Sequence, residues 1–264
     1  YFDVQYGNPS SIHQFGRKAK NAIQKARKQV AALIGAKPDE ILFTSGGTES
    51  NNTILYGIPK SQGPKFVLNH IITSSIEHEA ILEPCRDLEK NGVKVTYLPV
   101  DEQGIVNPNH ITDSINSQTV IVSIMFANNE VGTIQPIKEI SKICNKYQIP
   151  LHTDAVQAVG KVPINVKELG VDALSISSHK INGPKGVGAL FIKKGLTTAP
   201  EILGGGQENG MRSGTENVAS IVGFGKACEI AKERLNEDIS HFQTLHSSML
   251  SKIVKEIPHV KLNG

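Results

Sequence analysis

The sequence predicts an α/β protein whose central sheet is mainly parallel. Short runs of apolar and β-branched residues alternate with segments of helical periodicity, a pattern typical of β-α-β units. Polar residues cluster directly after four of these runs, and α/β proteins bind ligands beyond the carboxyl ends of their parallel strands. The 264 residues, of which 39% are hydrophobic, are enough to bury a substantial core.

The first predicted element is a helix over residues 12–34. Gly35 follows it and is a typical residue for ending a helix. The helical spacing predicts one apolar face, made of Phe15, Ala19, Ala22, Ile23, Ala26, Val30 and Leu33.

The runs that follow predict strands and the helices between them. The strand-like runs are 41–44, 70–75, 93–100, 119–126, 150–155, 173–178 and 188–193. A glycine-rich helix start follows the first run, and further helical patterns cover 77–92 and 136–148. A long helical pattern runs from Glu216 to about Ile257, and Gly223 and Gly225 interrupt it.

The overall composition argues against several functional classes. The 28 basic and 25 acidic residues are spread along the chain, and a net charge of +3 is too weak to indicate nucleic-acid binding. No apolar run is long enough for a membrane span, and we expect no signal peptide. The three cysteines are widely spaced in helical patterns, which favours neither disulfides nor a CxxC metal site and indicates a reducing, cytoplasmic setting.

The first polar cluster, TSGGTESNN, contains Gly47 and Thr48 at the predicted start of a helix. Glycines let a backbone approach an anion closely, and a helix start offers free N–H groups, so the cluster predicts a phosphate site. An ordinary turn explains the same residues equally well. The cluster is neither a Walker loop nor a GxGxxG motif.

Two further clusters follow the second and fourth runs. SSIEHEA contains His78, which is expected at a helix start where Glu77 and Glu79 interact favourably with the helix dipole. FANNEVG contains Asn128, and its asparagines also suit a turn.

The remaining cluster, LHTDAVQAVGK, places Asp154 at a strand end and Gln157 three residues later. A buried carboxylate is costly unless a cation pairs with it, and either Lys180 or a pyridinium nitrogen could do so. The later stretch SISSHKINGPKG puts Lys180 itself after a strand. A phosphate site, an acid, a histidine and a lysine together are the groups that pyridoxal phosphate requires.

A metal site is the rival interpretation from a different class. His78, His152, His179 and Asp154 are possible ligands, with Glu77 or Glu79 as a base. Their spacing matches no known metal motif, so we expect no metal.

The motifs GNPSSIHQFG, FTSGGTESNN, VSIMFANNEVGTIQP, HTDAVQAVGK, SSHKINGPKGVGALF and GGGQENGMRSGTEN together resemble the NifS/IscS group of cysteine desulfurases. This group lies within the class V aminotransferases of pyridoxal-phosphate fold type I. The resemblance implies a cofactor-binding large domain over 1–230, and a linker helix with the start of a truncated small domain over 231–264.

The resemblance also implies a role for each site residue. Lys180 would form the Schiff base with the cofactor and move the substrate's α-proton, and His78 would stack on the ring. Asp154 would pair with the ring nitrogen, while Gln157 and Asn128 would contact the ring hydroxyl. The phosphate ligands would be Gly47, Thr48, Ser177 and His179, with Thr215 reaching the phosphate of a neighbouring subunit in a homodimer.

The implied reaction removes sulfur from L-cysteine, leaving alanine and a protein persulfide. The sulfur would pass to an acceptor or scaffold protein for iron-sulfur cluster assembly or tRNA thiolation. The family's nucleophilic cysteine lies on a loop of the small domain, so we expect none of Cys85, Cys144 and Cys228 to replace it. A selenocysteine lyase, another pyridoxal-phosphate enzyme of class V and a non-catalytic cofactor-binding fragment remain alternatives.

Overall fold

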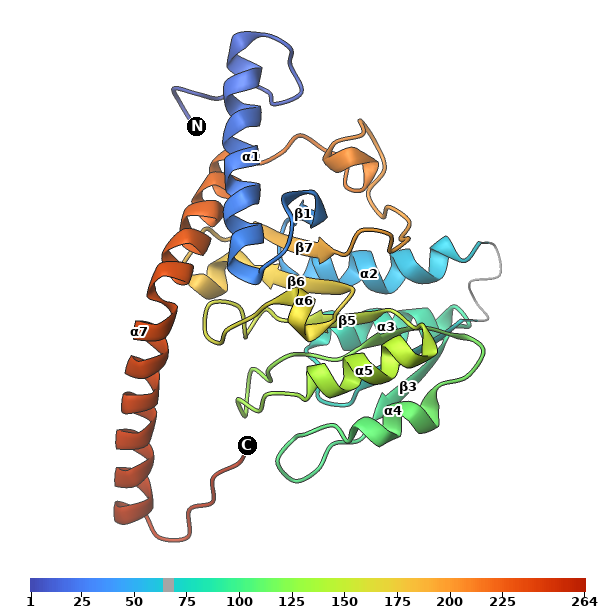
Figure 1. The fold of residues 1–264 in the computed structure, drawn as a ribbon, viewed down its shortest axis with the longest axis vertical. Helices are drawn as coiled ribbons and strands as arrows, with labels where there is room; N and C mark the ends of the chain where they lie inside the picture. The colour runs from blue at the N-terminus through green and yellow to red at the C-terminus, as the bar shows by residue number, and fades with distance from the viewer. Residues whose placement is uncertain (64–68) are drawn as a thin grey trace.

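A seven-stranded mixed sheet forms the centre of the protein (Figure 1), whose computed structural model describes residues 1–63 and 69–264. The strands are β1 (Ile41–Thr44), β2 (His70–Ser74), β3 (Lys94–Leu98), β4 (Thr119–Ser123), β5 (Leu151–Asp154), β6 (Ala173–Ser177) and β7 (Gly188–Ile192). Their order is β1-β7-β6-β5-β4-β2-β3, and only β7 runs antiparallel to its neighbours. The predicted strands and the mainly parallel sheet are confirmed.

Helices cover both faces of the sheet, which is why whole strands such as β2 and β6 are buried (Figure 1). One face packs against α2 (Gly47–Ser61) and α3 (Glu79–Lys90). The other face packs against α1 (Gln14–Ile34), α4 (Pro108–Ser114), α5 (Ile137–Tyr147), α6 (Val166–Leu169) and the first turns of α7 (Val218–Glu256). Among the helices described, none combines the length and apolar character needed to cross a bilayer.

Helix α1 ends where the sequence predicts. Gly35 adopts the left-handed conformation with φ 69°, and its N–H donates to the carbonyl of Ala31. One predicted core residue is misplaced, because Phe15 is 65% exposed. It lies in the first turn of α1, and this end of the helix projects beyond the sheet (Figure 1).

Helix α7 is continuous, so the predicted interruption at its glycines is wrong. A Cβ on Gly225 would lie 2.6 Å from Ala26 Cα, so the glycine allows α1 and α7 to pack closely. The buried residues of α7 all lie between Ile221 and Cys228. The domain division at residue 231 therefore falls within one helix, and it stays a prediction.

The sheet topology brings the polar clusters together. Antiparallel β7 separates β1 from the parallel strands, so β1 points in the same direction as β6. The carboxyl ends of β1, β2, β4, β5 and β6 consequently lie along one edge of the sheet.

Candidate functional site

A pocket of about 180 Å³ opens at this edge of the sheet. Eight residues that the sequence predicts as site residues line it: Gly47, Thr48, His78, Asp154, Gln157, Ser177, His179 and Lys180. They come from the carboxyl ends of four different strands, β1, β2, β5 and β6, and the fold alone brings them together.

One end of the pocket is formed by the start of α2. The first backbone bond of this helix runs from Ser50 N–H to the carbonyl of Gly46, so the preceding N–H groups have no partner within the helix. A Cβ on Gly47 would lie 2.6 Å from Val156 Cγ2, so this close approach of α2 to the β5 connection requires glycine. The free N–H groups and the positive end of the helix dipole suit an anion.

Two side chains from the end of β6 complete this part of the pocket. Ser177 is buried, and its Oγ shares a 2.9 Å hydrogen bond with His179 Nδ1. Burial lowers the pKa of His179, and the positive charges of Lys180 and Lys185 lower it further. A bound anion would counter this effect, since a negative charge stabilises the imidazolium form.

Asp154 lies at the end of β5 and is 7% exposed. Its Oδ1 accepts a hydrogen bond from Val156 N–H at 2.9 Å, and its Oδ2 accepts one from Asn51 Nδ2 at 2.7 Å. Burial raises the pKa of Asp154, whereas these two donors and the positive charge of Lys180 act to lower it. These two hydrogen bonds hold the carboxylate of Asp154 in one orientation, in which it can bind a cation in the pocket.

Lys180 lies in a 3-10 turn (Ser178–Ile181) directly after β6. The turn ends at Asn182 in the left-handed conformation with φ 61°. The side chain of Lys180 lines the site pocket and also a second cavity of about 170 Å³ against α7. Lys180 and Asp154 thus line the same pocket, and the positive charge of Lys180 acts to lower the pKa of Asp154.

His78 performs the structural role that the sequence suggests and also lines the pocket. It is the N-cap of α3, where its Nδ1 accepts a hydrogen bond from Ala80 N–H at 3.0 Å. This bond orients the imidazole ring while the side chain stays exposed at the pocket.

Gln157 is oriented by a residue that sequence reasoning missed. Lys161 Nζ donates to Gln157 Oε1 at 3.0 Å. An ammonium group can only donate, so the amide oxygen of Gln157 faces Lys161 and its NH₂ group is the end left for a ligand. Burial lowers the pKa of Lys161, as does the positive charge of Lys180.

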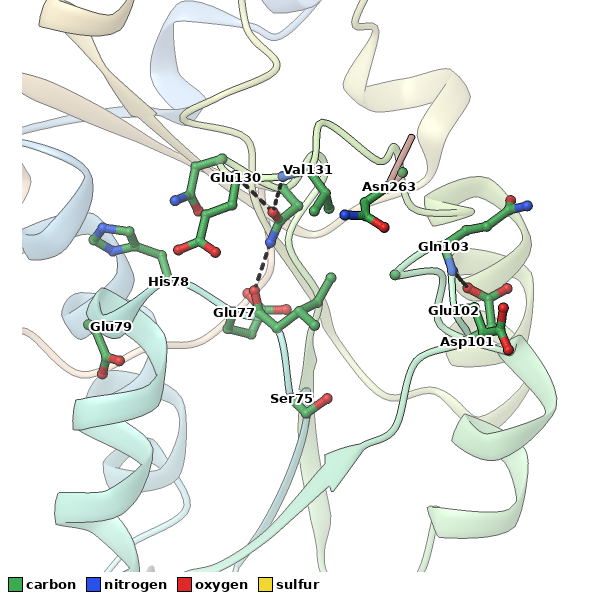
Figure 2. Close-up of a pocket in the computed structure, with 15 residues that line it drawn as sticks. Ser75, Glu77, His78, Glu79, Asp101, Glu102, Gln103, Glu130, Val131 and Asn263 are labelled. Carbon is green, nitrogen blue, oxygen red and sulfur yellow. Dashed lines mark hydrogen bonds between the residues drawn. The ribbon is translucent and has the colours of Figure 1, made fainter. Parts of the chain in front are cut away.

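The structure places Asn129 at the pocket in place of Asn128. Asn128 is buried in the turn after β4, where its Oδ1 accepts from the N–H groups of Glu130 and Val131 and its Nδ2 donates to the carbonyl of Ile76. Dashed lines in Figure 2 mark the bonds that the N–H groups of Glu130 and Val131 donate. The turn role that the sequence left open thus belongs to Asn128.

Glu77 differs from its predicted place at the start of a helix. It precedes α3, is only 5% exposed, and accepts hydrogen bonds at Oε1 from Ser74 Oγ at 2.6 Å and Met125 N–H at 2.8 Å. Burial raises its pKa to about 8. A buried acid therefore connects the turn before His78 to the segment that follows β4.

A larger and acidic hollow of about 690 Å³ adjoins the site and shares His78 and Asn129 with it. Figure 2 shows Glu79 and His78 on one side of this hollow and Asp101 and Glu102 on the other. The concentration of carboxylates makes it unsuitable for a phosphate, so the smaller pocket is the better anion site.

Thr215 lies away from the site pocket of its own chain. It is exposed and lines a separate hollow with Arg212. Arg212 forms an ion pair with Glu49 at 2.8 Å, and this pair links the Thr215 loop to the first turn of α2. The pKa of Glu49 is below its usual value because the donors from Arg212 and Ser45 outweigh the effect of burial.

The three thiols are poorly placed for nucleophilic chemistry. Cys85, Cys144 and Cys228 are buried in α3, α5 and α7, as their helical patterns predict. Burial raises the pKa of Cys85 and of Cys144 to about 12 and also raises that of Cys228. A thiol that stays protonated is a weak nucleophile.

The histidines and acids form no metal centre within residues 1–63 and 69–264, where no group of three or more potential ligands comes together. His152, a ligand in the rival interpretation, hydrogen-bonds to Ser123 and Ser175 at 2.9 and 3.0 Å. Its burial lowers its pKa to about 3, so it is a neutral residue of the core.

Known proteins match the whole chain. The chain is 54% identical over 264 residues to a cysteine desulfurase IscS of Dictyoglomus turgidum, of which it spans 66%. A solved structure of a NifS-like protein superposes with a TM-score of 0.93 at 44% identity, covering 96% of this chain and 70% of that one. A structure of SspA in complex with cysteine has a TM-score of 0.82 at 41% identity, covering 86% and 65%.

The chain spans 65 to 66% of the length of two cysteine desulfurases that it matches over its whole length. The aminotransferase class-V family matches it over residues 1–264. The sheet order, the site at the carboxyl ends of the strands and the family match agree, and the chain belongs to the aminotransferase class-V family.

Proposed function

We propose that this chain carries the pyridoxal-phosphate site of a cysteine desulfurase. The observation that carries the proposal is the pairing of an oriented, buried carboxylate, Asp154, with Lys180 in one pocket that also has the N-terminus of a helix at its end. These groups fit a cofactor with a ring nitrogen, an aldehyde and a phosphate. Cysteine desulfurases at about 50% identity over the whole chain support the same assignment.

Each residue of the pocket then has a physical task. The free N–H groups at Gly47 and Thr48, with Ser177 and His179, would hold the phosphate. Asp154 would pair with the ring nitrogen through a charge-assisted hydrogen bond, which contributes about 1.5 to 3 kcal/mol.

The remaining residues face the ring and the substrate. His78 would cover the ring, while the NH₂ group of Gln157 and the side chain of Asn129 would meet ring oxygen atoms. Lys180 would attach the cofactor covalently and then take and return the proton at the substrate α-carbon. When bound, the cofactor withdraws electrons from that carbon.

The proposed substrate is L-cysteine, whose C–S bond breaks while its sulfur bonds to a protein thiolate. Alanine and a persulfide are then the products. The buried Cys85, Cys144 and Cys228 are unsuited to supply this thiolate, which supports a nucleophile other than these three thiols.

A homodimer is part of the proposal, with Thr215 contacting the phosphate in a second subunit. The exposure of Thr215 and the ion pair that anchors its loop to α2 support this role. Acceptor proteins for the sulfur, including iron-sulfur scaffold proteins, are proposed from the family resemblance.

Borohydride trapping tests the site. The chain incubated with pyridoxal phosphate should gain a visible absorption band, and reduction should leave one modified peptide that contains Lys180. Lys180→Ala should abolish the modification, because Lys180 is the lysine among the described residues that line the pocket. Lys185→Ala, which removes an exposed lysine five residues later, is the matched control. A modified peptide elsewhere in the wild-type chain would refute the assignment.

L-cysteine tests the proposed substrate. Its addition should change the visible band of the loaded chain at lower concentration than addition of D-cysteine or L-serine. Equal responses to the three amino acids would contradict a cysteine-specific site.

A further inference from the structure

Asn51 is a buried amide that contacts the carboxyl group of Asp154. It lies in α2, is 0% exposed and lines the site pocket. Its Nδ2 donates to Asp154 Oδ2 at 2.7 Å, while its own Oδ1 has no hydrogen-bond partner among the described residues. The bond to Asp154 is therefore the polar contact that sets the orientation of this side chain.

The two donors to Asp154 come from different elements and bind different oxygens. Val156 N–H, in the connection after β5, binds Oδ1, and Asn51 Nδ2, from α2, binds Oδ2. Two donors on two oxygens hold the plane of the carboxyl group and favour its ionised form, which burial disfavours. The bond from Val156 uses a backbone N–H group, so a side-chain substitution at position 156 leaves that donor in place. The bond from Asn51 uses a side chain and is removed by substitution of that residue.

The charged groups around Asp154 act in both directions. Lys180 lies on the pocket side and acts to lower its pKa, whereas the neighbouring carboxyl group of Glu77 interacts with it repulsively. Asn51 is a neutral donor, so its hydrogen bond does not depend on the charge state of either group.

We propose that Asn51 is a positioning residue that keeps Asp154 ionised and aligned, so that Asp154 holds a proton on the cofactor's ring nitrogen. This inference rests on the proposed function. Asn51 does not touch the reacting atoms, and its effect passes entirely through Asp154.

The next residue of the helix provides a matched control. Asn52 Nδ2 donates to the carbonyl of Thr48 at 2.8 Å, and its side chain does not line the pocket. Replacements at positions 51 and 52 therefore make the same chemical change one residue apart in the same helix. Asn51→Leu removes the donor at similar volume, and Asn51→Ala removes it without adding apolar bulk. Asn52→Leu and Asn52→Ala are their controls.

The first measurement is the protonation state of the ring nitrogen. The chain is loaded with pyridoxal phosphate labelled with ¹⁵N in the ring, and the ¹⁵N chemical shift is recorded. We expect the wild-type chain and both Asn52 variants to show the protonated nitrogen, and both Asn51 variants to shift toward the neutral form. An unchanged shift in the Asn51 variants would overturn the proposal.

The second measurement uses a cofactor analogue as a control. In 1-deazapyridoxal phosphate a carbon replaces the ring nitrogen, so Asp154 has no proton to hold. Asn51→Ala should weaken binding of pyridoxal phosphate roughly tenfold, the size of a charged hydrogen bond, and leave binding of the analogue unchanged. Equal losses for both molecules would mean that Asn51 only maintains the fold, which would also overturn the proposal.

The wild-type chain separates this inference from the proposed function. If the wild-type chain binds no pyridoxal phosphate, the proposed function fails and the inference fails with it. If the wild-type chain binds the cofactor with a protonated ring nitrogen and the Asn51 variants do the same, only the inference fails.

Discussion

The ends of β5 and β2 each bury a carboxyl group, and the protein holds the two groups in opposite ways. Asp154 receives one donor on each oxygen. Glu77 receives both of its donors on Oε1, and its Oε2 has no partner among the described residues. Burial raises the pKa of both groups, to about 8 for Glu77, and around Asp154 its two donors and the positive charge of Lys180 act against that rise.

The difference shows that burial alone does not determine the charge of an acid. Donors distributed over both oxygens stabilise a carboxylate, and a free second oxygen leaves room for a proton. Asp154 is therefore prepared to meet a cation, and Glu77 is a neutral acid that joins the ends of two neighbouring strands. Three experiments test this contrast, in order of decreasing expected effect.

Removal of the Glu77 side chain should cause the largest loss of stability. Glu77→Ala leaves the donors of Ser74 and Met125 buried without an acceptor, at a cost of roughly 1 to 3 kcal/mol for each donor. Urea unfolding followed by circular dichroism would measure the loss. Glu79→Ala, an exposed position two residues later, is the control. Equal stability of the two variants would contradict the role of Glu77.

Replacement of Asp154 should mainly reduce cofactor affinity. Asp154→Asn keeps the size of the side chain and removes its charge, so binding of pyridoxal phosphate should weaken roughly 10- to 150-fold. Equilibrium titration of the visible band would measure this change. Asp113→Asn removes an exposed carboxylate of α4 and should leave affinity as it is. If both variants bind the cofactor as the wild type does, Asp154 is not its partner.

The smallest expected effect is a pH dependence that belongs to Glu77. Its pKa rises from 4.5 to about 8 on folding, so between these values the folded chain holds a proton that the unfolded chain has released. Stability from this group is complete below pH 4.5 and is lost as the pH rises toward 8. Glu77→Gln removes the loss, and its stability relative to wild type should rise by at most about 1.4 kcal/mol per pH unit.

Unfolding midpoints at pH 5, 6 and 7 would reveal this slope, since all three values lie within the predicted window. Glu79→Gln should follow the wild type across the same range. A constant difference between Glu77→Gln and wild type would show that Glu77 is ionised in the folded chain.

Much of the fold could be predicted because its determinants are local. Each strand is a short run with β-branched residues, and Gly35 ends α1 as its position indicates. Gly225 was misinterpreted, because a glycine within a helical pattern looks the same whether it breaks the helix or lets a neighbour approach. Phe15 is exposed because its end of α1 lies beyond the sheet. The periodicity of the α1 sequence shows which residues share a face, but it does not show where along its length the helix meets the sheet.

The site was partly predictable for the same reason. Asp154 is the last residue of β5 and Lys180 lies in the turn after β6, so the topology brings them to the same pocket. Asn128 and Asn129 are neighbours in a turn. A turn has no regular spacing of side chains, so the sequence does not show which of the two asparagines lines the pocket. Asn51 carried a signal that was missed, since it follows Gly47 by four residues and lies on the same helical face.

Glu77 had no such signal in the sequence. It accepts a hydrogen bond from the backbone N–H of Met125, which lies just after β4 and 48 residues later in the sequence. Adjacent charges in a sequence are usually solvent-exposed, and only the tertiary structure shows that Glu77 and Glu79 have different environments.

The close contact between α1 and α7 has a mechanical consequence. A helix of 39 residues is about 58 Å long, and the buried residues of α7 lie in its first turns. The same turns adjoin the segment after β6, where Ala227 and Ile230 line the cavity that Lys180 also lines. The exposed later turns of α7 continue from this segment without a break, so a contact made on those turns lies on the same helix as a wall of the lysine's cavity.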